Sequence, residues 1–90
     1  MGHQRRAGTR QSDRAAALHA ADRILSLTRR EHQVLDAVVE GRSNKMIAHD
    51  LGINARTVET HRARLLERLG VRTTVEAVRL ATLSCLITQQ

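Results

Sequence analysis

The stretch SNKMIAHDLGINARTVETHRARLLERLG, residues 43–70, decides the fold of this 90-residue chain. Ser43 and Asn54 are favoured N-cap residues, and each precedes a segment whose apolar residues recur at helical spacing. Gly52 separates the two segments, because glycine adopts the left-handed conformation of a tight turn without the steric cost of a Cβ. A short helix, a glycine-containing turn and a longer helix make a helix-turn-helix motif, which we place at about residues 44–63.

The second helix of the motif has a more varied polar face than solubility requires. At about 100° per residue, Val58, Leu65 and Leu69 share one apolar side. The opposite side carries Arg56, Glu59, Thr60, Ala63, Arg64 and Glu67. In the DNA major groove, arginine binds guanine, glutamate accepts from cytosine N4, and threonine or alanine contacts the thymine methyl. The alternative is a solvated helix with an ion pair between Glu59 and Arg62; we favour the groove because of the motif.

The composition favours duplex DNA as the partner. The formal net charge is +6 and the sequence pI is about 11.4, a balance that favours polyanions. Of the 15 basic residues only Lys45 is lysine, although codon usage in a GC-rich genome would also enrich arginine. The chain has no Phe, Tyr or Trp, whereas single-strand binders and most RNA-binding modules stack bases on aromatic rings.

The segments before the motif have a different character. Residues 1–12 are polar, basic and aperiodic, and we expect a disordered tail there. Residues 13–27 are expected to hold a short linker helix, ending near Leu25. Its apolar residues at helical spacing are Leu18, Ala21 and Leu25, joined by Ala17 and Ile24.

Residues 28–88 are expected to form one all-α domain of four helices. Capping boxes occur at Thr28/Glu31 and Thr73/Glu76, and Gly41 and Gly70 are helix stops. Beside the apolar side of residues 58–69, the expected inward-facing residues are Val34, Leu35, Val38, Ile47, Ala48 and Leu51. No strand-like alternation is present.

The start of the short helix is a candidate phosphate-binding site. Asn44 and Lys45 lie where free backbone amides and the helix dipole favour an anion. Further basic residues near helix ends, which fit a solvated surface equally well, are Arg29, Arg30, Arg42 and Arg72.

Four motifs, LTxRE (27–31), GxSNKxIAxxLGI (41–53), TVExHR (57–62) and LGV (69–71), precede the segment TVEAVRLA (74–81). Over about residues 26–83 the chain resembles the LuxR/FixJ (NarL)-type helix-turn-helix domain of response regulators. The resemblance implies a transcription regulator whose third domain helix lies in the major groove and whose fourth helix dimerises. It implies base contacts from Glu59, Thr60 and Ala63, with Asn44, Lys45, Arg56, Thr57 and Arg64 nearer the backbone. Arg62, on the flank of the third helix, completes the expected DNA-binding set. Members usually carry a receiver or ligand-sensing domain, so the chain is a stand-alone regulator or the effector part of a longer one.

The last helix is apolar on two sides, which predicts a second copy as partner. Val75, Val78, Thr82 and Cys85 line one side, and Leu80, Leu83 and Ile87 line the other. Because so small a domain cannot bury both sides, we expect Leu80, Leu83 and Ile87 to form a homodimer contact. The alternative is an exposed apolar fringe. RNA polymerase is a further candidate partner.

Other function classes fit less well. The histidines show no metal-ligand spacing and Cys85 has no activating neighbours, so we expect neither an enzyme nor a metal or cofactor. Without a membrane-spanning run or signal peptide, a cytoplasmic protein is expected. Two alternatives stay open: region 4 of a sigma factor, and a helical protein-interaction module. DNA binding should weaken steeply with salt, whereas apolar docking should not.

Overall fold

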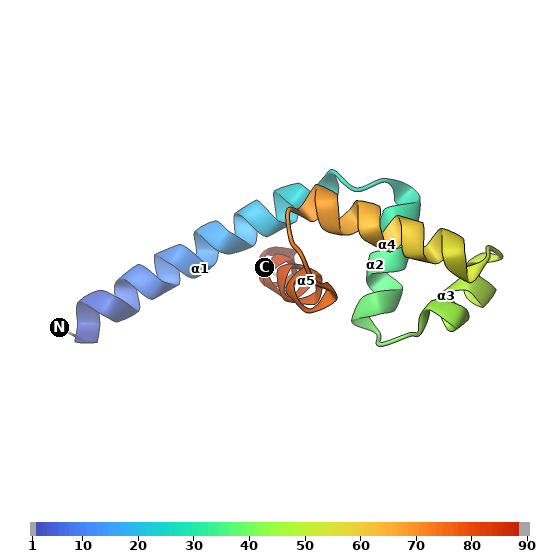
Figure 1. Ribbon diagram of the computed structural model, residues 1–90. Coiled ribbons are helices and arrows are strands. Elements are labelled where there is room, and N and C mark those ends of the chain that lie inside the picture. Colours follow the sequence, from blue (N-terminus) through green and yellow to red (C-terminus); the bar gives the residue numbers. More distant parts are fainter. Residues whose placement is uncertain (1, 89–90) are drawn as a thin grey trace.

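The computed structural model describes the backbone of residues 2–88 and the side chains of residues 14–85. Over this range the chain forms α1 (Gly2–Leu25), α2 (Arg29–Val39), α3 (Asn44–Leu51), α4 (Ala55–Leu69) and α5 (Thr74–Thr88), without strands. Figure 1 shows α2, α3 and α4 grouped together, α5 seen nearly end-on beside them, and α1 extending away. The expected all-α class, with a helix preceding four domain helices, is confirmed. None of these helices is long and apolar enough to cross a membrane.

Helix α1 is longer than the sequence predicted. It begins at Gly2 rather than near residue 13, so residues 2–12, expected to be a disordered tail, are helical. No proline interrupts this segment, and lengthening an existing helix costs far less than starting one. The radius of gyration is 15.1 Å, against about 12 Å for a compact chain of this length, because α1 projects from the other helices (Figure 1).

The packed side of α1 is also rotated from the expected one. Ala17 and Ala20 are 1% and 0% exposed and Ile24 packs against the core, whereas Leu18 and Leu25 are 53% and 78% exposed. The helices α1 and α5 pack against one another, and Figure 1 shows them crossing at a large angle. Small alanine side chains allow two helix backbones to approach closely, so the alanines, and not the leucines, face the neighbouring helix.

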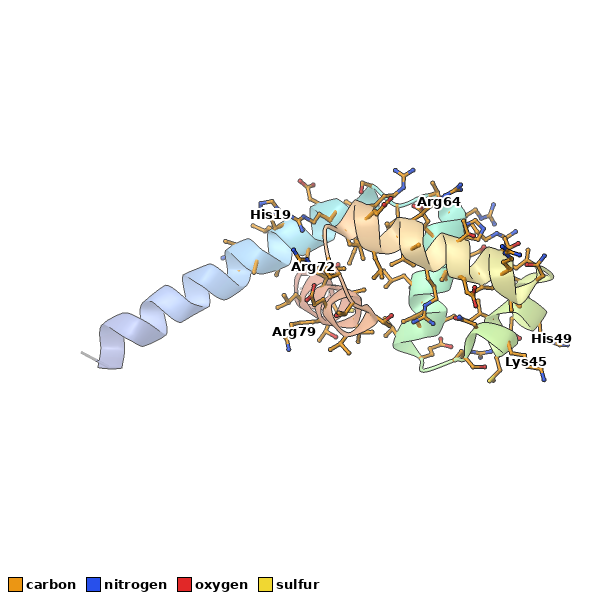
Figure 2. All side chains as sticks on the ribbon, viewed as in Figure 1. His19, Lys45, His49, Arg64, Arg72 and Arg79 are labelled. Carbon is orange, nitrogen blue, oxygen red and sulfur yellow. The ribbon has the colours of Figure 1, made fainter. Side chains whose placement is uncertain are left out.

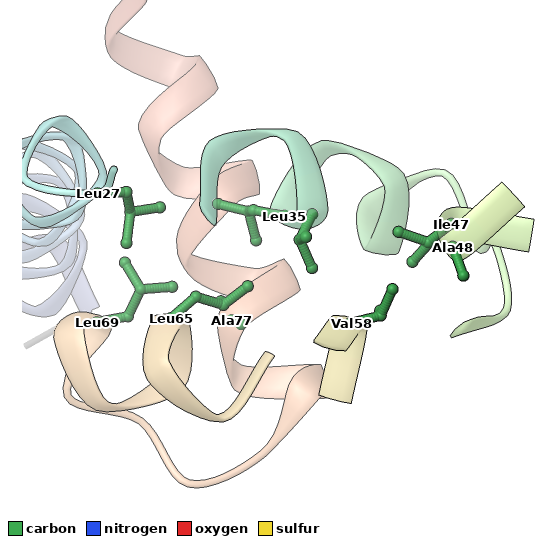
Figure 3. Packing of buried hydrophobic residues seen from close by; sticks show 9 residues of the cluster. Leu27, Leu35, Ile47, Ala48, Val58, Leu65, Leu69 and Ala77 are labelled. Atoms are coloured by element: carbon green, nitrogen blue, oxygen red, sulfur yellow. The ribbon is translucent and has the colours of Figure 1, made fainter. Parts of the chain in front are cut away.

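The core is a single cluster centred on α4. Figure 3 shows its members coming from every helix except α1, with Leu27 from the loop after it. The buried residues are Leu27, Val34, Leu35, Ile47, Ala48, Val58, Leu65, Leu69 and Ala77. Val38 and Leu51, also expected inside, are only partly buried at its edge. The helix α4 contacts each of the other four helices. Because its buried residues all lie on one side, these contacts fix how α4 is rotated about its own axis.

The helix starts follow local hydrogen bonds, as the sequence predicted at Thr28, Ser43 and Asn54. Thr28 and Glu31 form a complete capping box, and the side chains of Ser43 and Asn54 accept from backbone amides three residues on. The box expected at Thr73 is only half formed. The Glu76 amide donates to Thr73 Oγ1, but the Glu76 carboxylate accepts from the Arg72 amide instead of returning to Thr73.

Glu31 connects the start of α2 to the far half of α4. Its side chain is buried, accepts from the Thr28 amide at 2.9 Å, and lies 2.9 and 3.0 Å from Arg68 Nε through its two oxygens. Burial alone would raise the pKa of Glu31. The hydrogen bonds from Thr28 and the ion pair with Arg68 outweigh burial, and the pKa lies below its ordinary value.

Replacing Glu31 should make stability depend less on pH. Since the folded-state pKa is lowered, the carboxylate stabilises the fold above the ordinary glutamate range, near pH 4, and this contribution is lost as the pH falls through the folded pKa. Glu31→Gln should destabilise the domain by roughly 2 kcal/mol at neutral pH. Thermal unfolding by circular dichroism should show this difference shrinking in acid. The exposed Glu67→Gln variant is the control, and an equal pH response in both variants would contradict the assignment.

Arg23 fastens α1 to the end of α4. Its Nη1 donates to the Leu69 carbonyl at 2.7 Å, one of the carbonyls left without a helical partner. The next residue, Gly70, has φ of +70°, and a Cβ there would lie 2.9 Å from Arg23 Nη1. The left-handed turn therefore favours glycine at residue 70, and a Cβ there would also move the Arg23 guanidinium away from the Leu69 carbonyl.

Gly70→Ala should cost more stability than Gly52→Ala, although both glycines have nearly the same φ. A Cβ at Gly52 would meet nothing within 4 Å, so that variant carries only the left-handed strain of about 1 kcal/mol. Chemical denaturation of both variants should show the extra loss at Gly70. In an Arg23→Ala background the two losses should become equal; an unchanged gap would exclude the Arg23 contact as its cause.

Candidate nucleic-acid interface

The polar side of α4 is open to solvent along its whole length. Its members, expected to face away from the core, are all exposed: Arg56, Glu59, Thr60, Ala63, Arg64 and Glu67. Figure 2 shows Arg64 projecting from α4 on the side away from α5. The side chains of Arg56 and Arg64 form no ion pair with any described residue. The charges on this face are therefore available to an external ligand.

An open cleft of about 340 Å³ runs along the first half of α4. It is lined by Asn54, Arg56, Thr57, Thr60, His61 and Arg64. Two arginines and no carboxylate line it, so it attracts anions. Asn54 and His61 line the cleft in addition to the residues expected from the sequence. Their positions in the sequence could have indicated this, since Asn54 directly precedes the helix and His61 lies one turn after Thr57.

Asn54 both starts α4 and orders the entrance of this cleft. Its Oδ1 accepts from the Thr57 amide at 2.7 Å and from the Thr57 hydroxyl at 2.9 Å. Thr60 is held in a similar way, since its hydroxyl donates to the Arg56 carbonyl at 3.2 Å. Both threonine hydroxyls thus have defined positions before any ligand arrives.

Glu59 and Ala63 lie on the other edge of the exposed side, outside the cleft. The alternative of an ion pair between Glu59 and Arg62 is not observed. No described residue forms an ion pair with Glu59, and the Arg62 guanidinium is engaged elsewhere. Glu59 therefore stays on the candidate interface as an exposed acceptor.

Arg62, expected among the DNA-binding residues, is placed differently. It is half-buried, Nη1 donates to Asn44 Oδ1 at 2.7 Å, and Nη2 donates to Thr74 Oγ1 at 2.7 Å. Four residues after the buried Val58, it lies on the flank of α4 beside the core, over Leu66. Two of its donors point into the protein, toward Asn44 and Thr74, and a direct DNA contact from Arg62 stays a prediction.

The start of α3 carries a second group of candidate residues. Lys45 is exposed, and Figure 2 shows it with His49 at the outer end of the domain. Asn44 is half-buried and its Oδ1 accepts from Arg62. The free amides of the first turn add to the attraction for an anion near Lys45.

The arginines near helix ends do not behave alike. Arg42 pairs with Glu40 at 3.0 Å and with Asp50, and these two carboxylates raise its pKa. It is therefore a surface link between α2 and α3. Arg29 and Arg72 are exposed and Arg30 is half-buried, without an ion pair to a described residue.

The residues expected to form a dimer contact are not all free. Leu80 packs against the domain core and Leu83 is half-buried, while the side chain of Ile87 lies outside the described residues. Helix α1 covers part of α5, a partner within the same chain that the sequence analysis did not consider. Val75 is 69% exposed at the start of α5.

An open, mainly apolar groove of about 350 Å³ lies between α2 and α5. It is lined by Ile24, His32, Leu35, Asp36, Val39, Glu40, Ala81, Thr82, Ser84 and Cys85. The alternative of a protein-interaction module was expected to use Leu80, Leu83 and Ile87, and of these the described residues Leu80 and Leu83 do not line the groove. It is separate from the cleft on α4, with which it shares no residue.

Comparison with known proteins agrees with this geometry. Residues 25–81 match the family described as bacterial regulatory proteins, luxR family. The chain is 44% identical over 75 residues to the transcriptional regulatory protein FixJ of Azorhizobium caulinodans, covering 83% of this chain and 35% of the relative. It is 49% identical over 57 residues to the transcriptional regulatory protein UhpA of Salmonella typhimurium, covering 63% and 29%. The crystal structure of full-length FixJ from B. japonicum superposes with a TM-score of 0.78 at 35% identity, covering 91% of this chain and 40% of that one. The chain thus spans about a third of the length of these curated relatives.

Removing Arg56 or Arg64 should weaken binding to duplex DNA whatever its sequence. Each substitution by alanine removes an unpaired charge from the cleft, and we expect about tenfold weaker binding and a less steep salt dependence. Fluorescence anisotropy with a mixed-sequence duplex measures both. The control is Arg79→Ala, which removes the same charge from exposed α5, where Figure 2 shows the side chain pointing away from α4. Equal losses in all three variants would mean that only net charge matters.

Proposed function

The chain belongs to the LuxR family of bacterial regulatory proteins, which are DNA-binding transcription regulators, and we propose that it recognises duplex DNA by placing α4 in the major groove. One observation carries this proposal. The side of α4 opposite Val58, Leu65 and Leu69 is exposed over its full length, and Arg56 and Arg64 on it are unpaired among the described residues. A helix with one side fixed and the other open has the shape that a major groove admits.

Within this proposal the expected contact residues of α4 divide into two roles. Arg56, Thr57 and Arg64 bind the DNA backbone, where sequence is not read. Glu59, Thr60 and Ala63 read bases, by accepting from cytosine N4 or contacting the thymine methyl. A carboxylate beside phosphates is repelled, so the exposed Glu59 is best explained by a contact to a base.

The start of α3 supplies a separate backbone contact in the same proposal. Lys45 is exposed and lies in the first turn, where backbone amides favour phosphate. Phosphate contacts from α3 set the depth and angle at which α4 enters the groove.

The partners of a whole regulator are also proposed. The chain would bind two DNA half-sites as a homodimer. Of the residues predicted to form the dimer contact, Leu80 packs against the core, which leaves Leu83 as the described residue outside the core cluster. A receiver domain and RNA polymerase are further partners proposed from the resemblance to response regulators.

Selection of binding sites from random duplexes tests the function. The wild type should enrich a defined sequence, and its affinity should fall with salt at a log–log slope of about −0.9 per neutralised phosphate. Glu59→Ala should change the preferred base at one or two positions. Glu67→Ala, which removes the same charge from a later turn of α4, should leave the preference unchanged.

Two results would count against the proposal. Failure of the wild type to enrich any sequence, with binding independent of salt, would reject DNA recognition. Identical preferences for wild type and Glu59→Ala would reject base reading by Glu59 while leaving DNA binding intact.

A further inference from the structure

Arg62 joins three helices at one point without a carboxylate partner. From α4 it donates 2.7 Å hydrogen bonds to Asn44, the first residue of α3, and to Thr74, the first residue of α5. It is half-buried, and no described acid forms an ion pair with it. Because desolvating a charge is costly, a partly buried guanidinium is stabilised by hydrogen-bond acceptors around it. Here the charge is held by two neutral oxygens between two helix N-termini, which are themselves positive ends of dipoles.

This arrangement determines which end of the Asn44 amide faces outward. A guanidinium has donors only, so the Asn44 oxygen must face Arg62 and the Nδ2 group must be turned to the other side. No described residue accepts a hydrogen bond from Nδ2. Its two donors are therefore unused in the first turn of α3, next to exposed Lys45.

We infer that Arg62 is a positioning residue for DNA binding: it holds the Asn44 amide so that Nδ2, beside Lys45, donates to a phosphate oxygen. The inference rests on the proposed function. Without Arg62 the amide can rotate and present its oxygen, which a phosphate repels. Thr74 holds the second Nη of Arg62, so the start of α5 belongs to the same arrangement.

A double-mutant cycle between Arg62→Lys and Asn44→Ala tests the inference. Lysine keeps the charge but cannot reproduce the fork that reaches two acceptors. We expect each single variant to bind a mixed-sequence duplex about tenfold more weakly, and the double variant no more weakly than either one. If Arg62 touched DNA itself, the two losses would multiply to about a hundredfold. If only its charge mattered, Arg62→Lys would bind like the wild type. Either result overturns the inference.

Asn44→Asp separates positioning from a merely structural role. The carboxylate would still accept from Arg62, now as an ion pair, so the melting temperature should stay equal or rise. The same change removes the Nδ2 donor, and binding should fall further than in Asn44→Ala. Binding that simply follows the melting temperature across these variants would reject the inference.

Thr74→Val is the variant to use if Arg62→Lys does not fold. It removes the second acceptor of Arg62 while keeping a β-branched residue at the start of α5, and it should weaken binding less than Asn44→Ala. If the two single variants Thr74→Val and Asn44→Ala both bound DNA with wild-type affinity, the inference would be overturned. Absence of wild-type binding at low salt would instead reject the proposed function itself.

Discussion

The fold depends on holding α4 from one side only. Val58, Leu65 and Leu69 bury three successive parts of that side, and every other helix packs against it. Polar contacts also hold α4 from the core side and its flanks. Arg68 near the end of α4 binds buried Glu31, and the last carbonyls of α4 meet Arg23. All of these contacts lie on the core side and flanks of α4. The opposite side is therefore exposed to solvent while the orientation of the helix stays fixed.

The partners of the described arginines separate structural from functional charge. Arg42 and Arg68 pair with carboxylates, and Arg23 and Arg62 donate to neutral oxygens of other helices. Arg56 and Arg64 form no such contacts. Arg29, Arg30, Arg72 and Arg79 also have no ion pair with a described residue, so unpaired positive charge is spread over several elements. Arg56 and Arg64 differ because both line the cleft on α4. Because net charge alone does not select a DNA site, the position of these two arginines in the cleft matters more for recognition than the excess of arginine does.

Helix α1 is attached to the domain at its C-terminal half and extends away from it. Ala17 and Ala20 permit its close packing against α5, and the Arg23 side chain binds the end of α4. A displacement of α1 would therefore reach α4 through the Leu69 carbonyl and Gly70. The same packing covers part of α5, which reduces the apolar surface available to a second copy below what the sequence suggested.

The sequence by itself determined the four domain helices and the side of α4 that faces the core. Thr28, Ser43 and Asn54 could be read as caps because each bonds to an amide three residues away, and the apolar period of α4 is equally local. Only the tertiary structure decided the partners of residues on helix flanks and the packed side of α1. Arg62 bonds to residues 18 and 12 positions away, and the alanines of α1 were chosen over its leucines by how closely α5 approaches. Such contacts depend on the angles at which helices cross, and the local pattern of one helix holds no information about those angles.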